Sequence, residues 1–256
     1  MDECAAYWDR VGRARARHHL ERRVAEYKGR EHVRLIGEWL GAGDRRVALK
    51  TDAYEEAYGP DTFVPWLLSR TDSVSVVDVS KAIASRAKLV VHGADYSCAD
   101  VRSLPYRDCS FDLVVSNSTL DHLSPSDVPA ALSEINRVMR ARGVLVLTLD
   151  NAHNPLYRLG YSIEKRLGLQ GHMQEKCYLD SEVRPLLLTA GFSVSDVRSI
   201  VHLPTPFNLL AKTLSSISPG LMDIPIRMGI RFFSKFGMGG RNLRTGWFLA
   251  FRCVKD

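Results

Sequence analysis

Acidic and amide side chains follow several short apolar segments of this chain, at the places where those segments end. Asp78 closes SVSVVD, Asn117 follows FDLVVS, and Asp150 with Asn151 follows VLVLTL. Largely apolar runs of this length indicate buried parallel strands. Because ligands bind beyond the carboxyl ends of such strands, we expect these side chains to converge on one site.

Asp121 and His122 come shortly after Asn117 and are candidate catalytic residues. A histidine titrates near neutral pH, so it could take a proton from a hydroxyl or an amine. A turn before the next helix is the alternative interpretation of this pair. Further candidates at the same open face are His153, Tyr157, His172 and Tyr178.

A strand, a helix and a second strand are expected to position these groups. Phe111 to Val115 and Val144 to Leu149 are predicted strands, and from Val128 apolar residues recur at the spacing of one helix face. The crossover between two such parallel strands is right-handed. Four residues mark the expected helix ends: Ser124 or Ser126 at the N-cap, and Arg142 with Gly143 at the C-terminus.

Two of these segments, LPYRDCSFDLVV and RVMRARGVLVL, carry a family resemblance. From Arg46 to Val201 the chain resembles a class I S-adenosylmethionine-dependent methyltransferase with a type 11-like core, whose members carry LP-x4-FD and RV-x3-GG. One departure is Arg142, which stands where the first glycine is usual. The resemblance implies a three-layer, Rossmann-like α/β fold: a mostly parallel seven-stranded sheet with helices on both faces. It also implies S-adenosylmethionine as the cofactor.

The order of elements fits that expectation. Helices are predicted for residues 3–27, 32–40, 80–87 and 181–190, and for 54–70 with an interruption at Gly59 and Pro60. Strands are predicted for residues 46–49, 73–79, 94–99, 192–200 and 247–254. We expect an N-terminal helical cap over 1–44, the cofactor-binding core over 45–203, an insertion or lid over 204–245 and the last core strand over 246–256.

The loop after the first strand departs from the family pattern. An acidic, glycine-rich loop is usual there, because glycine lets backbone amides approach the cofactor closely. Lys50, Thr51 and Asp52 take its place, and no glycine occurs between Gly43 and Gly59. Either the site is lost, or side chains have replaced the backbone in binding the cofactor.

We favour replacement, because the segment has the charges that an amino-acid tail needs. Lys50 could pair with the tail's carboxylate, and Asp52, Glu55 or Glu56 with its ammonium. The alternative is an ion pair at a helix start, with Thr51 or Asp52 as the cap.

The resemblance assigns the remaining cofactor contacts. Asp78, followed by Val79, stands where an acid accepts hydrogen bonds from both ribose hydroxyls, although an acid at a helix N-terminus fits as well. Asp100 and Val101 match the adenine-binding turn, in which an acid meets the exocyclic amine. Asn117 would lie beneath the sulfonium, or is a turn residue.

The composition is that of one globular domain: 256 residues, 45% hydrophobic and 25% charged, with a net charge of +6. The chain has no apolar run long enough to span a membrane and no secretory signal, so we expect a cytoplasmic protein. Five cysteines without paired spacing argue against a zinc site or a disulfide framework. The basic cluster over 13–23 is interleaved with acids, which favours a solvated helix face over a nucleic-acid site.

The insertion over 204–245 combines apolar, aromatic and basic residues at helical spacing. It could be a lid over a lipophilic substrate, a dimer surface, a shallow membrane contact or ordinary packing. We predict a methyltransferase that acts on oxygen, nitrogen or carbon of a small, partly apolar metabolite, as a monomer or homodimer. The alternatives are an enzyme that uses the cofactor differently, as in its intramolecular alkylation, and a non-catalytic scaffold.

Overall fold

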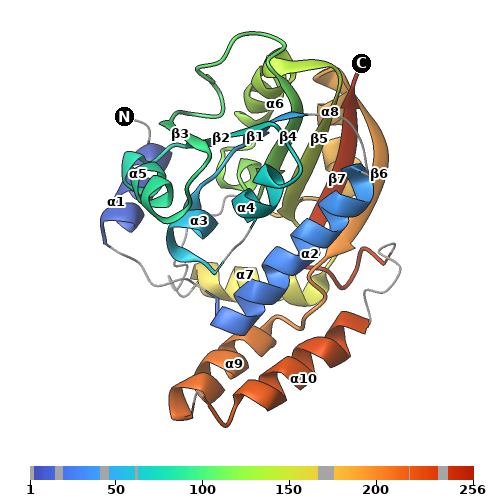
Figure 1. Ribbon diagram of the computed structural model, residues 1–256. Helices are drawn as coiled ribbons and strands as arrows, with labels where there is room; N and C mark the ends of the chain where they lie inside the picture. The colour runs from blue at the N-terminus through green and yellow to red at the C-terminus, as the bar shows by residue number, and fades with distance from the viewer. Residues whose placement is uncertain are drawn as a thin grey trace.

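A seven-stranded sheet forms the centre of the molecule (Figure 1). The computed structural model describes residues 3–14, 20–40, 46–60, 63–166, 176–218, 220–235 and 242–256. The strands are β1 (Val47–Lys50), β2 (Ser73–Asp78), β3 (Asp95–Cys98), β4 (Phe111–Asn117), β5 (Met139–Asp150), β6 (Phe192–Ile200) and β7 (Phe248–Lys255). Their order is β3-β2-β1-β4-β5-β7-β6; β1 to β5 pair in parallel, and β7 is antiparallel to β5 and β6. The predicted fold class is confirmed.

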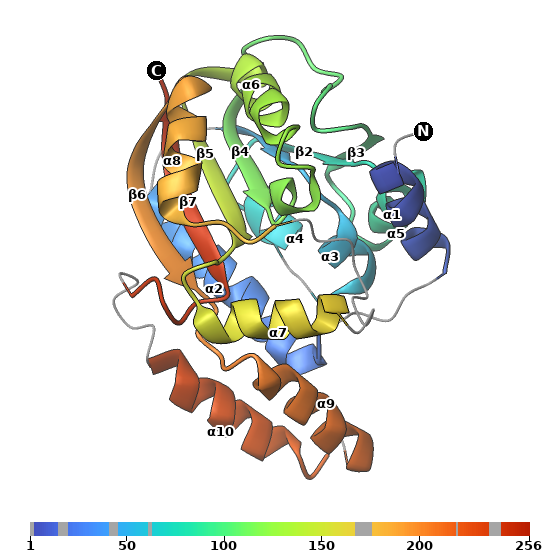
Figure 2. The same cartoon turned by 180° about the vertical axis from the view of Figure 1, so that it is seen from behind.

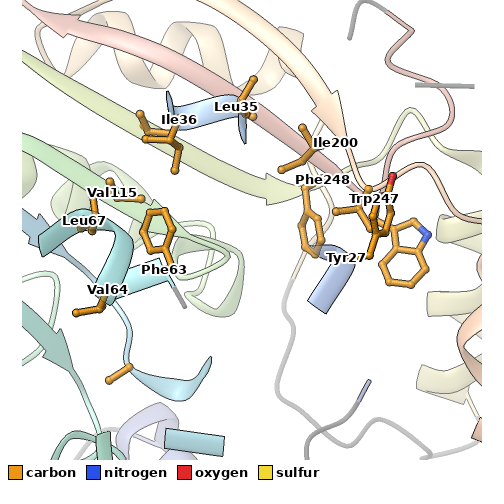
Figure 3. Close-up of a cluster of buried hydrophobic side chains, with 14 of the residues drawn as sticks. Tyr27, Leu35, Ile36, Phe63, Val64, Leu67, Val115, Ile200, Trp247 and Phe248 are labelled. Atoms are coloured by element: carbon orange, nitrogen blue, oxygen red, sulfur yellow. The ribbon is translucent and has the colours of Figure 1, made fainter. Parts of the chain in front are cut away.

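Helices cover both faces of this sheet (Figures 1 and 2). They are α1 (Glu3–Arg13), α2 (Arg22–Leu40), α3 (Tyr54–Tyr58), α4 (Phe63–Leu68), α5 (Lys81–Val90), α6 (Val128–Val138), α7 (Pro155–Arg166), α8 (Asp180–Thr189), α9 (Pro206–Ile217) and α10 (Asp223–Ser234). One core cluster joins α2, α4 and α5 to the sheet, and a second joins α6 and α8 to it. Figure 3 shows part of the first, with Ile36 of α2 and Phe63 of α4 near Val115 of β4.

The N-terminal helices differ from the prediction. Instead of one helix over 3–27 and another over 32–40, α1 ends at Arg13 and α2 runs without a break from Arg22 to Leu40. The start of α2 is set by Glu21, whose carboxylate accepts hydrogen bonds from the backbone amides of Arg23 (2.8 Å) and Val24 (3.4 Å). From the sequence, Gly41, Ala42 and Gly43 are expected to end the predicted helix over 32–40, and they lie outside the described residues.

Both predicted ends of α6 are also wrong. Ser124 and Ser126 bond each other at 2.8 Å, and the N-cap is Asp127, without a side-chain capping bond. The helix ends at Val138 rather than at Arg142, because the Lys255 ammonium caps the carbonyls of Asn136 and Met139, at 2.8 and 2.9 Å. A residue 116 positions away in the sequence therefore ends this helix, and β5 begins at once.

Arg142 has a φ of 62°, a left-handed conformation that favours glycine. It lies in the irregular stretch of β5 between the pairs Phe111–Met139 and Leu113–Val144. A left-handed backbone at this position explains why glycine is usual there in the family that the chain resembles. In this chain Arg142 adopts the left-handed conformation instead.

The described part of residues 204–245 contains the two helices α9 and α10, which lie side by side beyond one end of the sheet, with α7 nearest the strands (Figures 1 and 2). Ala211, Ile226 and Ile230 face inward and are buried, whereas Leu209 and Leu210 are exposed. Among the described residues, no helix has the length and apolarity needed to cross a bilayer.

Candidate active site

A cavity of about 1170 Å³ lies at the carboxyl ends of β1, β2, β4 and β5. Asp78, Asn117 and Asp150 all line it, as predicted from their strand ends. Asn151 does not; its side-chain amide instead donates to the carbonyls of Leu243 and Gly246, at 2.6 and 2.8 Å. The other predicted cofactor-binding and catalytic residues in the wall are Lys50, Thr51, Asp52, Glu55, Val79, Asp100, Val101, Asp121 and His122.

Lys50 is buried at the end of β1 inside an ion-pair cluster. Its ammonium donates to the Asp52 carbonyl (2.7 Å), the Asp52 carboxylate (2.8 Å) and the Glu56 carboxylate (3.0 Å). Burial lowers the pKa of Lys50, but the two carboxylates outweigh it and raise the pKa above its ordinary value. An ammonium has three N–H groups, so this arrangement leaves none for a ligand carboxylate. The ion pair of the alternative interpretation is present, but Ala53, not Thr51 or Asp52, is the N-cap of α3.

Asp78 ends β2 and joins that strand end to two loops. Its carboxylate accepts hydrogen bonds from the backbone amides of Ala53 (2.9 Å) and Ser80 (2.8 Å), one on each oxygen. Each carboxylate oxygen has a second acceptor site, which can face the cavity. Burial raises the pKa of Asp78 to about 7, against the lowering effect of the two amides. Ser80, the first residue of the predicted helix over 80–87, is the N-cap of α5, and its hydroxyl accepts from the Ile83 amide at 3.2 Å.

Polar groups from β1 and β4 form the cavity floor. The Thr51 hydroxyl lies 3.0 Å from the hydroxyl of Ser116 and 3.0 Å from that of Thr119. Beside them, Oδ1 of Asn117 is buried without a hydrogen-bond partner among the described residues. A ligand donor placed above β4 would satisfy that oxygen.

The predicted adenine turn is held by an ion pair. The Arg102 guanidinium donates to both carboxylate oxygens of Asp100, at 2.6 to 3.1 Å, and to Asp127 at 2.7 Å. Val101 between them is buried and also lines the cavity.

Asp121 and Asp150 form a buried acid pair at the carboxyl ends of β4 and β5. Asp121 is completely buried, and neither carboxylate oxygen has a hydrogen-bond partner of normal geometry within the described part of the chain. Burial raises the pKa of Asp121 to about 7, although the backbone amides of Asp121 and Asp150 lower it. Burial and the charge of Asp121 raise the pKa of Asp150 well above its ordinary value, while a hydrogen bond from Tyr157 lowers it. Two carboxyls so placed can share a proton or receive one.

The N-terminal helix covers part of the cavity. The Trp8 ring packs edge-on against His122, with 5.1 Å between centroids, and against Tyr54 at 5.9 Å. Asp9 anchors the same helix, accepting from the Ser80 hydroxyl (3.1 Å) and the Ala82 amide (3.3 Å). His122 is thus a wall residue in contact with a tryptophan.

Sequence reasoning missed Trp8, Lys28 and His32, which all line the cavity from α1 and α2. Lys28 donates to Glu55 at 2.7 Å, and His32 Nδ1 lies 2.9 Å from the Lys28 carbonyl. The four-residue spacing of Lys28 and His32 indicates that they share one face of a helix. The local sequence does not indicate which part of the molecule that face packs against.

The further catalytic candidates named from the sequence do not all line the cavity. Tyr157 lines the cavity, whereas His153 and Tyr178 are not among its lining residues. His153 Nε2 lies 2.8 Å from the Asp180 carboxylate. Glu56 is a predicted cofactor contact, but it pairs with Lys50 and is not among the residues that line the cavity. His172 lies outside the described residues.

Comparison with known proteins finds similarity to methyltransferases. Residues 56–147 match the family described as "Methyltransferase domain", and the match begins beyond the Lys50 to Asp52 segment. The chain is 32% identical over 125 residues to a malonyl-[acyl-carrier protein] O-methyltransferase of Erwinia billingiae, covering 47% of this chain and 48% of that protein. It therefore spans about half the length of the curated relatives it matches.

Solved structures show the same fold. A putative sarcosine dimethylglycine methyltransferase of Galdieria sulphuraria superposes with a TM-score of 0.62 at 15% identity, over 100% of this chain and 99% of that one. The [4+2]-cyclase SpnF superposes with a TM-score of 0.56 at 20% identity, over 88% and 80%. The superpositions show that the chain has the fold of these structures, and residues 56–147 of it match the methyltransferase domain family.

Proposed function

We propose that this protein binds S-adenosylmethionine and transfers its methyl group to a hydroxyl or amine of a small, partly apolar substrate. The observation that carries the proposal is Asp78, a buried acid on the cavity wall that two backbone amides fix. Each of its oxygens keeps one acceptor site, which suits a pair of adjacent ribose hydroxyls.

The rest of the cavity fits the cofactor's other parts. Asp52 lines the cavity with its side chain 20% exposed, so it is the acceptor we assign to the tail's ammonium. Lys50 holds Asp52 and Glu56 in place rather than contacting the ligand. Asp100 and Val101 are assigned to the adenine, Val79 to the wall beside the ribose and Asn117 to the position beneath the sulfonium. Thr51 connects β1 to the β4 loop below them.

The acid pair is assigned to the acceptor. Bound S-adenosylmethionine supplies an electrophilic methyl group on a sulfonium. The Asp121–Asp150 pair takes the proton of the acceptor's hydroxyl or amine as its oxygen or nitrogen bonds to the methyl carbon, and the electrons of the broken C–S bond stay on sulfur. Asp121 is the candidate base, because both of its oxygens are without a hydrogen-bond partner among the described residues.

The charges of the Asp121–Asp150 pair also affect which chemical group can be the methyl acceptor. The Erwinia relative is named for methylation of a malonyl group on a carrier protein. A carboxylate acceptor would meet the two buried acids here, which costs like-charge repulsion. A neutral hydroxyl or an amine would instead find hydrogen-bond acceptors, and we therefore favour these acceptors. We assign His122, in contact with Trp8, to the wall near that acceptor.

Product analysis tests the proposal against its alternatives. Purified protein is incubated with S-adenosylmethionine and a panel of hydroxyl and amine compounds, and the products are followed by mass spectrometry. Methyl transfer yields S-adenosylhomocysteine and a methylated acceptor, and Asp121→Asn should slow it without weakening cofactor binding. Methylthioadenosine from cofactor alone would favour intramolecular alkylation, and absence of cofactor binding would favour a scaffold.

A further inference from the structure

Exposed apolar side chains concentrate on one side of the molecule. Of the thirteen large hydrophobic residues that are exposed in the described part of the chain, ten lie on α7, α9, α10 or the turn between α9 and α10. We call these ten the apolar cap surface. They are 47 to 76% exposed, and the three helices lie together beyond the strand ends in both views of the molecule (Figures 1 and 2). Exposed apolar side chains gathered on neighbouring helices in this number usually mark a contact site.

The spacing gives α7 and α10 each an apolar row with basic residues beside it. On α7 the apolar row is Leu156, Leu159 and Ile163; on α10 it is Ile224, Met228 and Phe232. Arg166 lies beside the first row, and Arg227 and Arg231 lie beside the second. Over α7, α9 and α10, six Lys or Arg residues stand against two Asp or Glu. Apolar rows flanked by cationic side chains are the pattern of helices that lie on anionic lipid.

The cavity opens into this surface. Leu156, Leu159 and Leu209 are exposed and also line the cavity, so they stand at its mouth between α7 and α9. Lys212 of α9 lines the same mouth. An apolar chain leaving the cavity would therefore pass directly onto the apolar cap surface.

Close packing fixes the three helices in this arrangement. A Cβ at Gly160 of α7 would stand 2.8 Å from the Thr205 side chain, which precedes α9. A Cβ at Gly229 of α10 would stand 2.7 Å from the Phe207 ring of α9. The apolar rows are thus presented by a packed body, whose inner side chains Ala211, Ile226 and Ile230 are already buried.

We propose that the apolar cap surface rests on an anionic lipid bilayer, from which an amphiphilic substrate enters the cavity between α7 and α9. Charge selects this occupant over a second copy of the chain, because two copies meeting at this surface would bring two basic rims together. The substrate's polar head would reach the Asp121–Asp150 pair and its apolar tail would stay at the leucine mouth. That last assignment rests on the proposed methyl transfer, whereas bilayer binding does not.

Vesicle sedimentation tests the proposal without cofactor or substrate. The protein should bind vesicles of phosphatidylglycerol and phosphatidylcholine, and bind phosphatidylcholine alone at least about tenfold more weakly, with the difference shrinking in roughly 0.5 M salt. Leu210→Glu with Met228→Glu should reduce partition into the anionic vesicles by about tenfold or more. Both side chains are exposed and outside the cavity lining, so folding should survive, which the thermal midpoint checks.

Matched controls use equally exposed leucines elsewhere. Leu89→Glu on α5 and Leu188→Glu on α8 add the same charge at 77% and 68% exposed positions outside the apolar cap surface. They should leave vesicle binding within about twofold of the parent protein. No binding to anionic vesicles, or an equal loss in the control variants, overturns the proposal. So does a dimer in sedimentation velocity that the Leu210 and Met228 changes dissociate. Either failure leaves the methyl-transfer test unaffected, because vesicle binding is measured without cofactor.

Discussion

Replacing Lys50 by methionine should lower the free energy of unfolding of the protein. The side chain is 1% exposed, and all three of its N–H groups go to Asp52 and Glu56. Methionine keeps most of the apolar volume, so the main loss is the charge. The Glu56 side chain is 0% exposed and would keep a buried carboxylate without its cation, whereas Asp52, at 20%, can be solvated. Breaking such a buried pair costs roughly 3 to 5 kcal/mol of unfolding free energy.

Urea unfolding followed by circular dichroism measures this loss. Lys50→Met with Glu56→Gln should recover about 2 kcal/mol, because the unpaired carboxylate is gone. The Lys50→Met deficit should also shrink as the pH falls, since an unpaired buried glutamate has a raised folded pKa and its penalty vanishes once it is protonated. The control is Lys88→Met, at an exposed position of α5. Its unfolding free energy should stay within about 0.5 kcal/mol of that of the parent protein. A loss below about 1 kcal/mol for Lys50→Met, or no recovery in the double variant, would refute a structural role for this lysine.

Two further predictions concern single residues. Arg142→Gly should stabilise the protein by up to about 1 kcal/mol in urea unfolding, because Arg142 has a φ of 62° where glycine is strain-free; clear destabilisation would mean that its side chain matters more than its backbone. Asp121→Asn should raise stability by roughly 1 to 3 kcal/mol at pH 8, because burial raises the folded pKa of Asp121 to about 7 from an ordinary 3.8. A raised carboxyl pKa means that folded-state stability is lost as pH rises from about 4 to 7, so the advantage of the variant should fade toward pH 4; an advantage that is independent of pH contradicts the assignment.

Local sequence patterns were sufficient for the sheet and for the placement of most site residues. The predicted ranges of β1, β2, β3, β6 and β7 agree with the structure to within one residue at each end. The parallel topology then brought Asp78, Asn117 and Asp150 to one cavity, as the rule for open sheets requires.

The remaining features depend on contacts between distant parts of the chain. The end of α6 depends on Lys255, and the covering of His122 depends on Trp8 in α1. Whether Lys50 faced a ligand or its own neighbours depended on where α3 placed Glu56. That both Asp121 oxygens lack a hydrogen-bond partner among the described residues could not be predicted either, because local pattern does not reveal which groups a buried carboxylate meets.

Calorimetric titration with S-adenosylhomocysteine tests the central claim most directly. The account predicts a dissociation constant in the micromolar range or tighter, about −8 kcal/mol or better. Asp78→Asn should weaken it about tenfold or more through lost hydrogen bonds to a charged acceptor, while Asp95→Asn, on an exposed residue of β3 outside the cavity, should not. No heat and no thermal shift at millimolar ligand, or equal binding by the Asp78 variant, would contradict it.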